Sequence, residues 1–396
     1  MIRSTKVTTQ FINTGKQKLL REIREEYRRG LEFFINELWS YDEIPLFLPK
    51  EVINNFNSWL SKRMLQCCAK QASGIVRGVR KKQQERLYRI KKLMKEGKRE
   101  EVKHLQRIYD TTKITKPVIN SFEMELSPQI VSAISFNSDT SFEGWITLTS
   151  IGNKIKLQLP FNKNKHFNRL LKRGGSLKNS IKIGKKHITF VMELPDSKEK
   201  TGGSIVGLDI GQTTLISVSD GQAVETDPHG HTMKSICDKL ARKKKGSKGF
   251  LRAQKHRDNF IHYCINQIDW KNIKTLRIEK IRNLRFKKRI SKSLSGWVSS
   301  RILDLLKVKC EDSGVRVVEI SPTYTSQRCS KCGWVQKANR AGKVFRCKSC
   351  GYTDDADMNA ARNISFTLPE VDWSKKQNRK GFYWNSLYCA SSDTSL

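Results

Sequence analysis

The chain has 396 residues, with 76 lysines and arginines against 38 aspartates and glutamates, so its formal net charge is +38. The length predicts two or three domains. Hydrophobic residues make up 37% and aromatic residues 9% of the sequence, which excludes a disordered polycation. A positive surplus of this size repels itself unless a polyanion neutralises it. Nucleic acid is therefore the first candidate partner, and an anionic membrane surface is the second.

The sequence contains no run of 18 apolar residues, so we expect no transmembrane helix. The N-terminal segment lacks the apolar stretch of a secretory signal, which predicts a cytoplasmic protein. Four of the ten cysteines form two CxxC pairs, a spacing that favours metal binding in a reducing compartment. The other six have no ligand spacing, and most are expected to be buried small residues or inert thiols: Cys67, Cys68, Cys237, Cys264, Cys310 and Cys389.

The first 110 residues are predicted to be mainly helical. Residues 2–14 alternate weakly, as in one strand, whereas residues 16–40 carry apolar side chains at a spacing of three and four, as in an amphipathic helix. Residues 50–110 are predicted to form further long helices, with a break at Gly97.

From about residue 117 the hydrophobic period changes to the alternation of β-strands. The segment 180–194 is predicted to be a hairpin that turns at residues 184–186, and a β-rich module is expected over 115–195. The following residues, 196–204, are polar, contain glycine and have no periodicity, which is typical of a linker between domains.

Strands and helices alternate after the linker, which predicts an α/β domain with a central sheet. Strands are expected within 204–221, 274–281 and 315–320, and helices within 233–268 and 294–313. A cysteine-containing module interrupts this pattern, and a helix then begins near residue 355. Residues 366–396 are polar and aperiodic, so a loose tail is expected there.

The cysteine module has the spacing of a zinc ribbon. Cys329 and Cys332 form one pair, Cys347 and Cys350 form the other, and fourteen residues separate the two pairs. Each pair supplies two of the four thiolates that tetrahedral zinc requires. A pair of redox dithiols is the alternative. The module is also basic, so it is expected to face phosphate, although a merely solubilising surface has the same composition.

Three separated carboxylates form the second pattern. Asp209 and Glu279 each follow an apolar run that is predicted to be a buried strand, and Asp357 lies in the first turn of an alanine-rich helix. Each acid alone has an ordinary explanation, such as a salt bridge or a favourable helix dipole. Together they have the composition of a two-metal nuclease site, in which several carboxylates converge on two Mg²⁺ ions. Asp354 and Asp355 compete for the role of the third acid.

The motifs resemble the TnpB family of RNA-guided nucleases encoded by insertion sequences, which are related to miniature type V CRISPR effectors. The resemblance covers residues 204–365 and is carried by GLDIG, by IEKI and by the segment from Tyr324 to Ile364, which includes YTSQ, both CxxC pairs and NAA. Over residues 1–195 it is carried by the order and type of the elements. The second acid is followed by Lys-Ile, where many relatives have Asp-Leu.

The resemblance implies a bilobed protein with an α/β RNase H-like (RuvC-like) nuclease domain, an inserted zinc ribbon, an N-terminal helical recognition module and a β-rich wedge module. The expected modules are a first wedge strand at 1–14, the recognition module at 15–114, the wedge module at 115–195, the nuclease domain at 205–328, the ribbon at 329–350 and the last nuclease helix at 351–365. The linker at 196–204 and the tail at 366–396 follow from local composition, and the tail has no counterpart in the family.

The same resemblance implies guide-RNA-dependent cleavage of double-stranded DNA in a prokaryotic cell, at the nucleoid. It assigns Asp209, Glu279 and Asp357 to two Mg²⁺ ions, with Asp357 selected because the third acid of the family precedes x-Asn-Ala-Ala. It assigns the four cysteines to one structural Zn²⁺. The guide RNA and the DNA target are the implied partners.

Three basic runs are candidate nucleic-acid surfaces. Residues 77–103 hold twelve lysines and arginines against four acids, residues 242–257 hold eight and no acid, and residues 280–292 hold seven and no acid. Contact with phosphates through such runs weakens steeply with salt. Four aromatic residues at helical spacing could stack on bases, although a core position is the more common one: Trp39, Phe56, Trp59 and Tyr88.

Three other functions are compatible with these patterns. One is a nuclease-silent, RNA-guided repressor, although the chain retains all three acids. Another is a basic zinc-ribbon protein that binds structural RNA, such as a ribosome-associated factor. The third is a transposase that joins strands, whose carboxylates would look the same.

Overall fold

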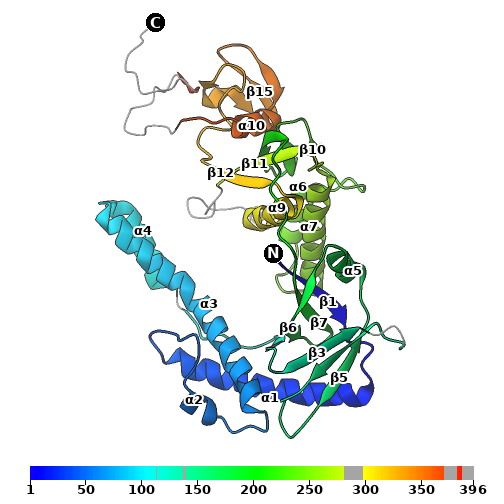
Figure 1. Ribbon diagram of the computed structural model, residues 1–396. Helices are drawn as coiled ribbons and strands as arrows, with labels where there is room; N and C mark the ends of the chain where they lie inside the picture. Colours follow the sequence, from blue (N-terminus) through cyan, green and yellow to red (C-terminus); the bar gives the residue numbers. More distant parts are fainter. Residues whose placement is uncertain (113, 137–139, 281–297, 370–380, 386–396) are drawn as a thin grey trace. The chain divides into compact units, whose positions relative to one another are not determined.

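The computed structural model describes all residues except 113, 137–139, 281–297, 370–380 and 386–396 (Figure 1). The chain divides into two compact units, Met1–Asp196 and Ser197–Leu396. The division falls at the start of the polar segment that was expected to be a linker. None of the helices in the described ranges combines the length and the apolar character needed to cross a membrane.

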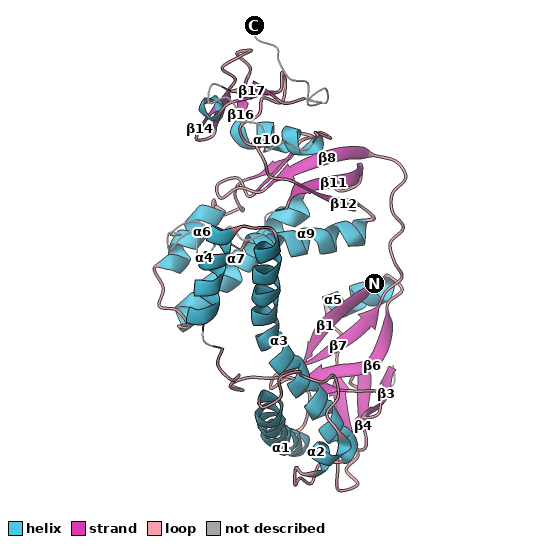
Figure 2. Ribbon diagram, turned by 90° about the vertical axis from the view of Figure 1, so that its left-hand side faces the viewer, coloured by secondary structure: helices cyan, strands magenta, loops and turns pink. Residues whose placement is uncertain are grey.

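The first unit contains two antiparallel sheets (Figure 2). The four-stranded sheet has the order β1-β7-β6-β2, with bounds Ile2–Thr8, His187–Glu193, Ser176–Ile183 and Met124–Leu126. The three-stranded sheet consists of β3 (Val131–Phe136), β4 (Gly144–Leu148) and β5 (Leu157–Phe161). The hairpin of β6 and β7 turns at residues 184–186 as predicted, and β1 pairs with β7 far along the chain.

The described part of the first unit holds five helices: α1 (Thr14–Trp39), α2 (Lys50–Asn54), α3 (Lys62–Lys95), α4 (Arg99–Thr111) and α5 (Lys165–Lys172). The α1 helix begins where the side chain of Asn13 accepts a hydrogen bond from the backbone of Lys16, and its apolar face is buried in the main core. Gly97, with φ of +69°, separates α3 from α4, as the sequence predicted.

The second unit is built on a five-stranded mixed sheet of order β10-β9-β8-β11-β12. The strands are β8 (Ser204–Asp209), β9 (Ile216–Val218), β10 (Ala223–Val224), β11 (Ile273–Glu279) and β12 (Arg316–Ile320). Strands β8, β11 and β12 are parallel, whereas β9 and β10 are antiparallel to their neighbours. The expected alternation of strands and helices is therefore present.

Helices cover both faces of this sheet (Figure 2). The α10 helix (Ala356–Ser365) lies on one face, and α6 (Met233–Ala241), α7 (Lys248–Gln267) and α9 (Ser299–Ser313) lie on the other. Val206 and Leu208 of β8 point into the core on the side of α7 and α9. The residue between them, Gly207, faces α10.

Gly207 permits an unusually close approach between strand and helix. A Cβ atom at this position would lie 2.1 Å from the carbonyl oxygen of Ala361 and 2.4 Å from the backbone nitrogen of Ser365. Both neighbours are backbone atoms, so no side-chain rotation would relieve the clash. The glycine therefore fixes α10 directly on β8, and this contact brings the first turn of α10 toward the end of that strand.

Short strands form the cysteine module. They are β13 (Trp334–Val335), β14 (Arg340–Ala341), β15 (Val344–Arg346) and β16 (Thr353–Asp355), with the 3-10 turn η2 (Lys337–Asn339). A further strand, β17 (Phe382–Tyr383), pairs antiparallel with β13.

Residues 381–385 differ from the loose tail that was expected over 366–396. The backbone nitrogen of Trp384 donates to Gly333, and Arg328 donates to the carbonyl oxygen of Trp384 at 2.6 Å. The indole of Trp384 is 5% exposed. A two-residue strand has no periodicity to detect, and its partner lies almost fifty residues earlier, so local sequence gave no signal for it.

Candidate active site and metal centre

The first two predicted acids, Asp209 and Glu279, lie at the same edge of the sheet. In the parallel pair β8 and β11, Leu208 lies opposite Ile278, so Asp209 and Glu279 follow at the carboxyl ends of adjacent strands. Both side chains are half-buried. The carboxyl ends of parallel strands are a common position for functional side chains because the strands hold them rigidly.

Asp357 reaches the same place from α10. It is 7% exposed, and a Cβ atom at Gly211, in the loop after β8, would lie 3.6 Å from its Oδ2 atom. The helix starts there because Asp355, the N-cap, accepts hydrogen bonds from the backbone of Asp357 and Met358.

The two competing acids have other contacts. Asp355 is used as the helix cap, and Asp354 accepts hydrogen bonds from the hydroxyl of Tyr352 and from Arg362. Asp357 is the acid of this segment whose charge acts on Asp209. The structure therefore brings together the same three acids that the resemblance selected.

The three carboxylates influence one another electrostatically. Burial, together with the negative charges of Glu279 and Asp357, raises the pKa of Asp209 to about 7, against the opposing charge of Arg340. Burial also raises the pKa of Glu279, against a hydrogen bond from Thr325 and the charge of Arg340. Adjacent acids whose ionisation is this unfavourable are typical of a site that binds cations.

The donor set suits a hard divalent cation. Three carboxylates supply oxygen ligands, which Mg²⁺ prefers, and waters or phosphate oxygens complete the shell of such an ion. The three acids are not among the clusters of the described residues whose ligand atoms all lie within 4.8 Å of one another.

Two further side chains touch the acids, and sequence reasoning did not assign them a role. Arg340 of the cysteine module donates to Asp357, with 2.8 Å between Nη2 and Oδ1. The hydroxyl of Thr325 donates to Glu279. Thr325 belongs to the YTSQ motif that was singled out, but nothing local indicated that it contacts an acid 46 residues earlier.

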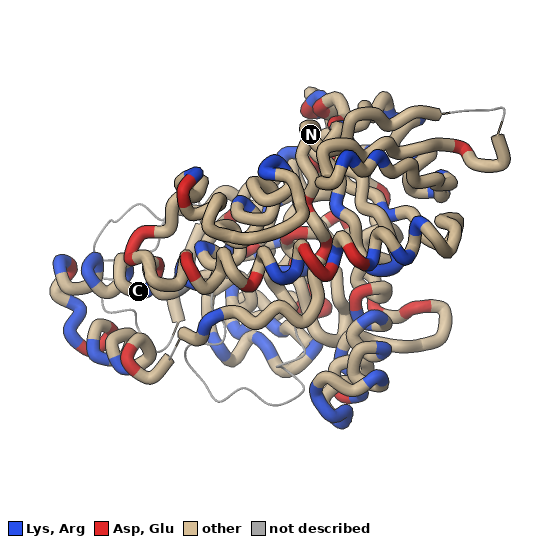
Figure 3. The backbone as a smooth tube through the Cα atoms, turned by 90° about the horizontal axis from the view of Figure 1, so that it is seen from below, with Lys and Arg blue, Asp and Glu red and all other residues tan. Residues whose placement is uncertain are grey.

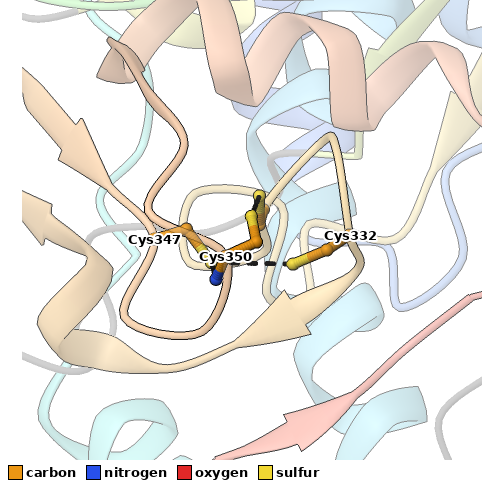
Figure 4. A group of neighbouring side chains, drawn as sticks. Cys332, Cys347 and Cys350 are labelled. Carbon is orange, nitrogen blue, oxygen red and sulfur yellow. Dashed lines mark hydrogen bonds between the residues drawn. The ribbon is translucent and has the colours of Figure 1, made fainter.

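The four predicted zinc ligands converge, and Figure 4 labels three of them, Cys332, Cys347 and Cys350. The Sγ atoms of Cys329 and Cys350 are 3.8 Å apart, those of Cys332 and Cys347 are 3.6 Å apart, and all four lie within 4.8 Å of one another. Zinc–sulfur bonds of 2.3 Å in a tetrahedron place sulfur atoms about 3.8 Å apart. The cysteines therefore fit Zn²⁺, and all of them are free thiols.

Glycines shape the two cysteine turns. Gly333 and Gly351 follow the second cysteine of each pair and have φ of +82° and +72°. Their backbone nitrogens donate back to the carbonyl oxygens of Cys329 and Cys347. Left-handed turns of this kind favour glycine, as the sequence predicted.

Buried asparagines attach the cysteine module to α10. The side chain of Asn363 donates to the carbonyl oxygens of Thr325 and Arg328, and its Oδ1 accepts a bond of 2.7 Å from the guanidinium of Arg328. Asn359 binds the backbones of Arg328 and Ser330. Because α10 also carries Asp357, these bonds couple the module to the three acids.

The basic runs occupy helices of both units, and lysine and arginine positions are spread widely along the chain (Figure 3). Residues 77–103 lie on α3 and α4, which pack together through a small apolar cluster around Ile90 and Leu93. A groove of about 260 Å³ between α6 and α7 is lined by Lys239, Lys243 and Arg252. Most of the third run, 280–292, lies outside the described residues.

The candidate stacking aromatics divide into two groups. Phe56 is buried in the core of the first unit, and Trp39 and Trp59 are half-buried beside it. Tyr88 is 73% exposed on α3 and is available to a base. The five described cysteines outside the CxxC pairs are all buried, as expected, whereas Cys389 lies outside the described residues.

Comparison with known proteins agrees with the predicted resemblance. Residues 300–364 match the family model "Cas12f1-like, TNB domain". The chain is 36% identical over 114 residues to the CRISPR-associated endodeoxyribonuclease Cas12f1 of Sulfoacidibacillus thermotolerans, covering 28% of this chain and 26% of the relative. It is 32% identical over 196 residues to the Putative RNA-guided DNA endonuclease InsQ of Escherichia coli (strain K12), covering 41% and 48%.

A third relative carries the TnpB name. The TnpB-like protein aq_aa05 of Aquifex aeolicus (strain VF5) is 36% identical over 95 residues, covering 22% of this chain and 31% of the relative. The chain thus matches about half or less of the length of these curated relatives. The predicted resemblance to TnpB-like and Cas12f1 proteins is confirmed.

One solved structure resembles this protein in fold over most of the chain. The mini-RNA-guided endonuclease CRISPR-Cas_phi3 aligns over 92% of this chain and 92% of its own, with a TM-score of 0.50 and 12% sequence identity. At this identity the likeness concerns the fold alone, and it supports the multi-part α/β architecture.

Proposed function

We propose that this protein is an RNA-guided endonuclease that cuts double-stranded DNA, of the TnpB type or of the related miniature type V CRISPR type. The observation that carries the proposal is the convergence of Asp209, Glu279 and Asp357 at one edge of the sheet of the second unit. The names of the relatives, which include RNA-guided DNA endonucleases, support the same reaction.

The three acids would hold two Mg²⁺ ions, and the sheet around them would be RNase H-like. When bound, such ions activate a water molecule and stabilise the leaving 3′ oxygen, which gives 5′ phosphate and 3′ hydroxyl ends. Thr325 would orient Glu279 through its hydroxyl. Arg340, which donates to Asp357, would bind a phosphate oxygen of the substrate.

The cysteine module would hold one structural Zn²⁺ and would brace this site from the side. The module contacts the site through the buried asparagines of α10. It also contacts the loop after β8, where the Nζ atom of Lys343 lies 3.0 Å from the hydroxyl of Thr214. Loss of the zinc would therefore leave both Asp357 and this loop less firmly positioned.

The partners would be a guide RNA and a DNA target. Base pairing reads the sequence in RNA-guided proteins, and the protein holds the heteroduplex by its shape and its phosphates. Basic helices such as α3, α4 and α7 suit this task, because they offer charge without a module that reads base edges. Binding should weaken steeply as the salt concentration rises.

The experiment that tests this proposal starts from the RNA that copurifies with the protein. Sequencing this RNA gives the guide, and a DNA library that carries the matching target beside randomised flanking bases then serves as substrate. Wild type should cut a subset of the library with Mg²⁺ and should cut nothing with EDTA.

Matched variants assign the reaction to the three acids. Asp209→Asn and Asp357→Asn should reduce cutting by at least about a hundredfold while RNA binding stays within twofold of wild type, because only the metal site loses charge. Asp304→Asn, an exposed acid on α9 of the same unit, is the control and should cut normally. Target binding without cutting by wild type would instead identify an RNA-guided repressor, and joined strands would identify a transposase.

A further inference from the structure

A second cluster of metal-ligating side chains lies on the helical side of the second unit. It consists of Asp227 and His231, in the loop before α6, and His256, in the middle of α7. One ligand atom from each of the three lies within 4.8 Å of the other two. No motif in the sequence indicated this cluster, because His256 is 25 residues beyond His231.

The loop holds the carboxylate of Asp227 in a fixed position. Its Oδ1 atom accepts hydrogen bonds from the backbone nitrogens of His229 and His231, both at 2.9 Å. Gly230, with φ of +76°, lies between these two residues in the turn. The side chain of Asp227 is 12% exposed.

The Oδ2 atom of the same carboxylate faces two imidazole nitrogens. Nδ1 of His231 is 3.1 Å away and Nε2 of His256 is 3.8 Å away. The two rings are nearly perpendicular, at 85°, with centroids 4.7 Å apart. The longer distance exceeds that of a hydrogen bond, so hydrogen bonding alone does not account for the position of His256.

A single metal ion accounts for all three positions. Bonds of 2.0–2.1 Å to nitrogen and oxygen in a tetrahedron place the ligands about 3.3 Å apart, and the two distances to Oδ2 lie on either side of this value. Two imidazoles and one carboxylate suit Zn²⁺ and similar transition metals, whereas Mg²⁺ prefers oxygen ligands alone. His231 and His256 are 40% and 28% exposed, so an ion can enter and can keep a water ligand.

We propose that Asp227, His231 and His256 form a transition-metal site that binds one Zn²⁺ ion, separate from the cysteine ribbon and from the three acids. The ion ties the loop before α6 to the middle of α7 and leaves its fourth position to water. It also fixes His256, which lines the basic groove between the two helices. The site stands whether or not the protein is a nuclease.

The test measures zinc content and does not depend on cleavage. Untagged protein with its copurified RNA is equilibrated with Zn²⁺ in a large excess of Mg²⁺, which fills phosphate and carboxylate sites, and is then freed of unbound metal. Elemental analysis should find two zinc ions per chain in wild type. Asp227→Asn and the double variant His231→Gln/His256→Gln should each retain one.

His262→Gln is the matched control, because His262 is an exposed histidine on the same helix, six residues after His256. It should retain two zinc ions. The ribbon zinc that remains in the cluster variants shows that the second unit is still folded. The proposal is overturned if wild type holds a single zinc, if the cluster variants keep two, or if the His262→Gln protein loses as much as they do.

Cobalt distinguishes the two sites by their spectra. Co²⁺ bound to the ribbon should give the intense thiolate charge-transfer absorption of sulfur ligands, whereas Co²⁺ bound by the cluster should add only weak visible bands. The added weak bands should be absent from the double histidine variant. Their persistence in that variant would mean that adventitious surface binding produces them.

Discussion

Arg340 of the cysteine module and Asp357 of α10 form an ion pair, with 2.8 Å between Nη2 and Oδ1. This pair connects the module to the candidate active site and places a cation where a metal ion would bind. Its partners are 31% and 10% exposed, so solvent screens the pair only in part.

Arg340→Gln should lower the Mg²⁺ concentration needed for half-maximal cleavage several-fold, because the arginine no longer competes for Asp357. The measurement is cleavage against Mg²⁺ concentration at pH 8.5, which is above the raised pKa of Asp209 of about 7. Arg346→Gln, an exposed arginine of the same module, is the control and should behave as wild type. A higher Mg²⁺ requirement in Arg340→Gln would show that the arginine assists metal binding instead.

Asp209→Asn should stabilise the Mg²⁺-free protein at high pH. The folded-state pKa of Asp209, about 7, lies above its ordinary value, so stability falls as the pH rises from about 4 to 7 and the unfavourable charge is fully present above 7. The neutral side chain avoids this charge. At pH 8, with the ribbon zinc bound and no Mg²⁺ added, the free energy of unfolding should be larger in the variant by on the order of 2–4 kcal/mol.

The Asp209→Asn difference should disappear below about pH 4, where the acid is protonated in both states. Denaturant unfolding, followed by tryptophan fluorescence at several pH values, gives the comparison. Mg²⁺ should stabilise wild type and should have little effect on the variant. A variant less stable than wild type at pH 8 without Mg²⁺ would contradict the assigned charge repulsion.

Cys347→Ser should abolish zinc binding by the ribbon and destabilise the second unit, because metal binding contributes directly to folding. Because the buried asparagines connect the ribbon to α10, Asp357 should also lose its fixed position. Cleavage should therefore fall together with zinc content. Elemental analysis and limited proteolysis measure the two effects. Cys310→Ser, a buried cysteine of α9 away from the ribbon, should keep the zinc. Unchanged zinc in Cys347→Ser would contradict the assignment.

Glu123 gives the first unit a separate pH dependence. Its pKa is lowered to about 2 despite partial burial, because Lys6, His187 and Thr189 all hydrogen-bond to the carboxylate. For an acid with a depressed folded-state pKa, the stabilisation is complete above about pH 5 and is lost as the pH falls toward 2.

The Glu123→Gln variant should therefore be less stable than wild type at pH 6, and the two should converge on acidification from about 4.5 to 2. Acid and denaturant unfolding of both proteins test this. Glu125→Gln, in β2 two residues after Glu123 and more exposed, is the comparison variant and should show a smaller effect. A difference between wild type and Glu123→Gln that stays constant with pH would exclude the ionised carboxylate as its cause.

The sequence by itself determined the features that depend on local spacing. The CxxC pairs with their glycines, the amphipathic helix that became α1, the hairpin at 184–186 and the alternation after residue 204 are all set by side chains close along the chain. Such patterns are readable because helix and strand periods act over a few residues. The choice of the third acid was different, since it came from family resemblance and not from spacing.

Tertiary structure alone decided which distant side chains meet. The ion pair of Arg340 with Asp357, the hydrogen bond of Thr325 to Glu279, the strand β17 on the cysteine module and the approach of His256 to Asp227 all join segments with no common pattern. These contacts depend on how the sheet and helices pack, as when Gly207 lets α10 lie directly on β8. Packing brings residues together in space without leaving a period in the sequence, so it could not be predicted from the chain alone.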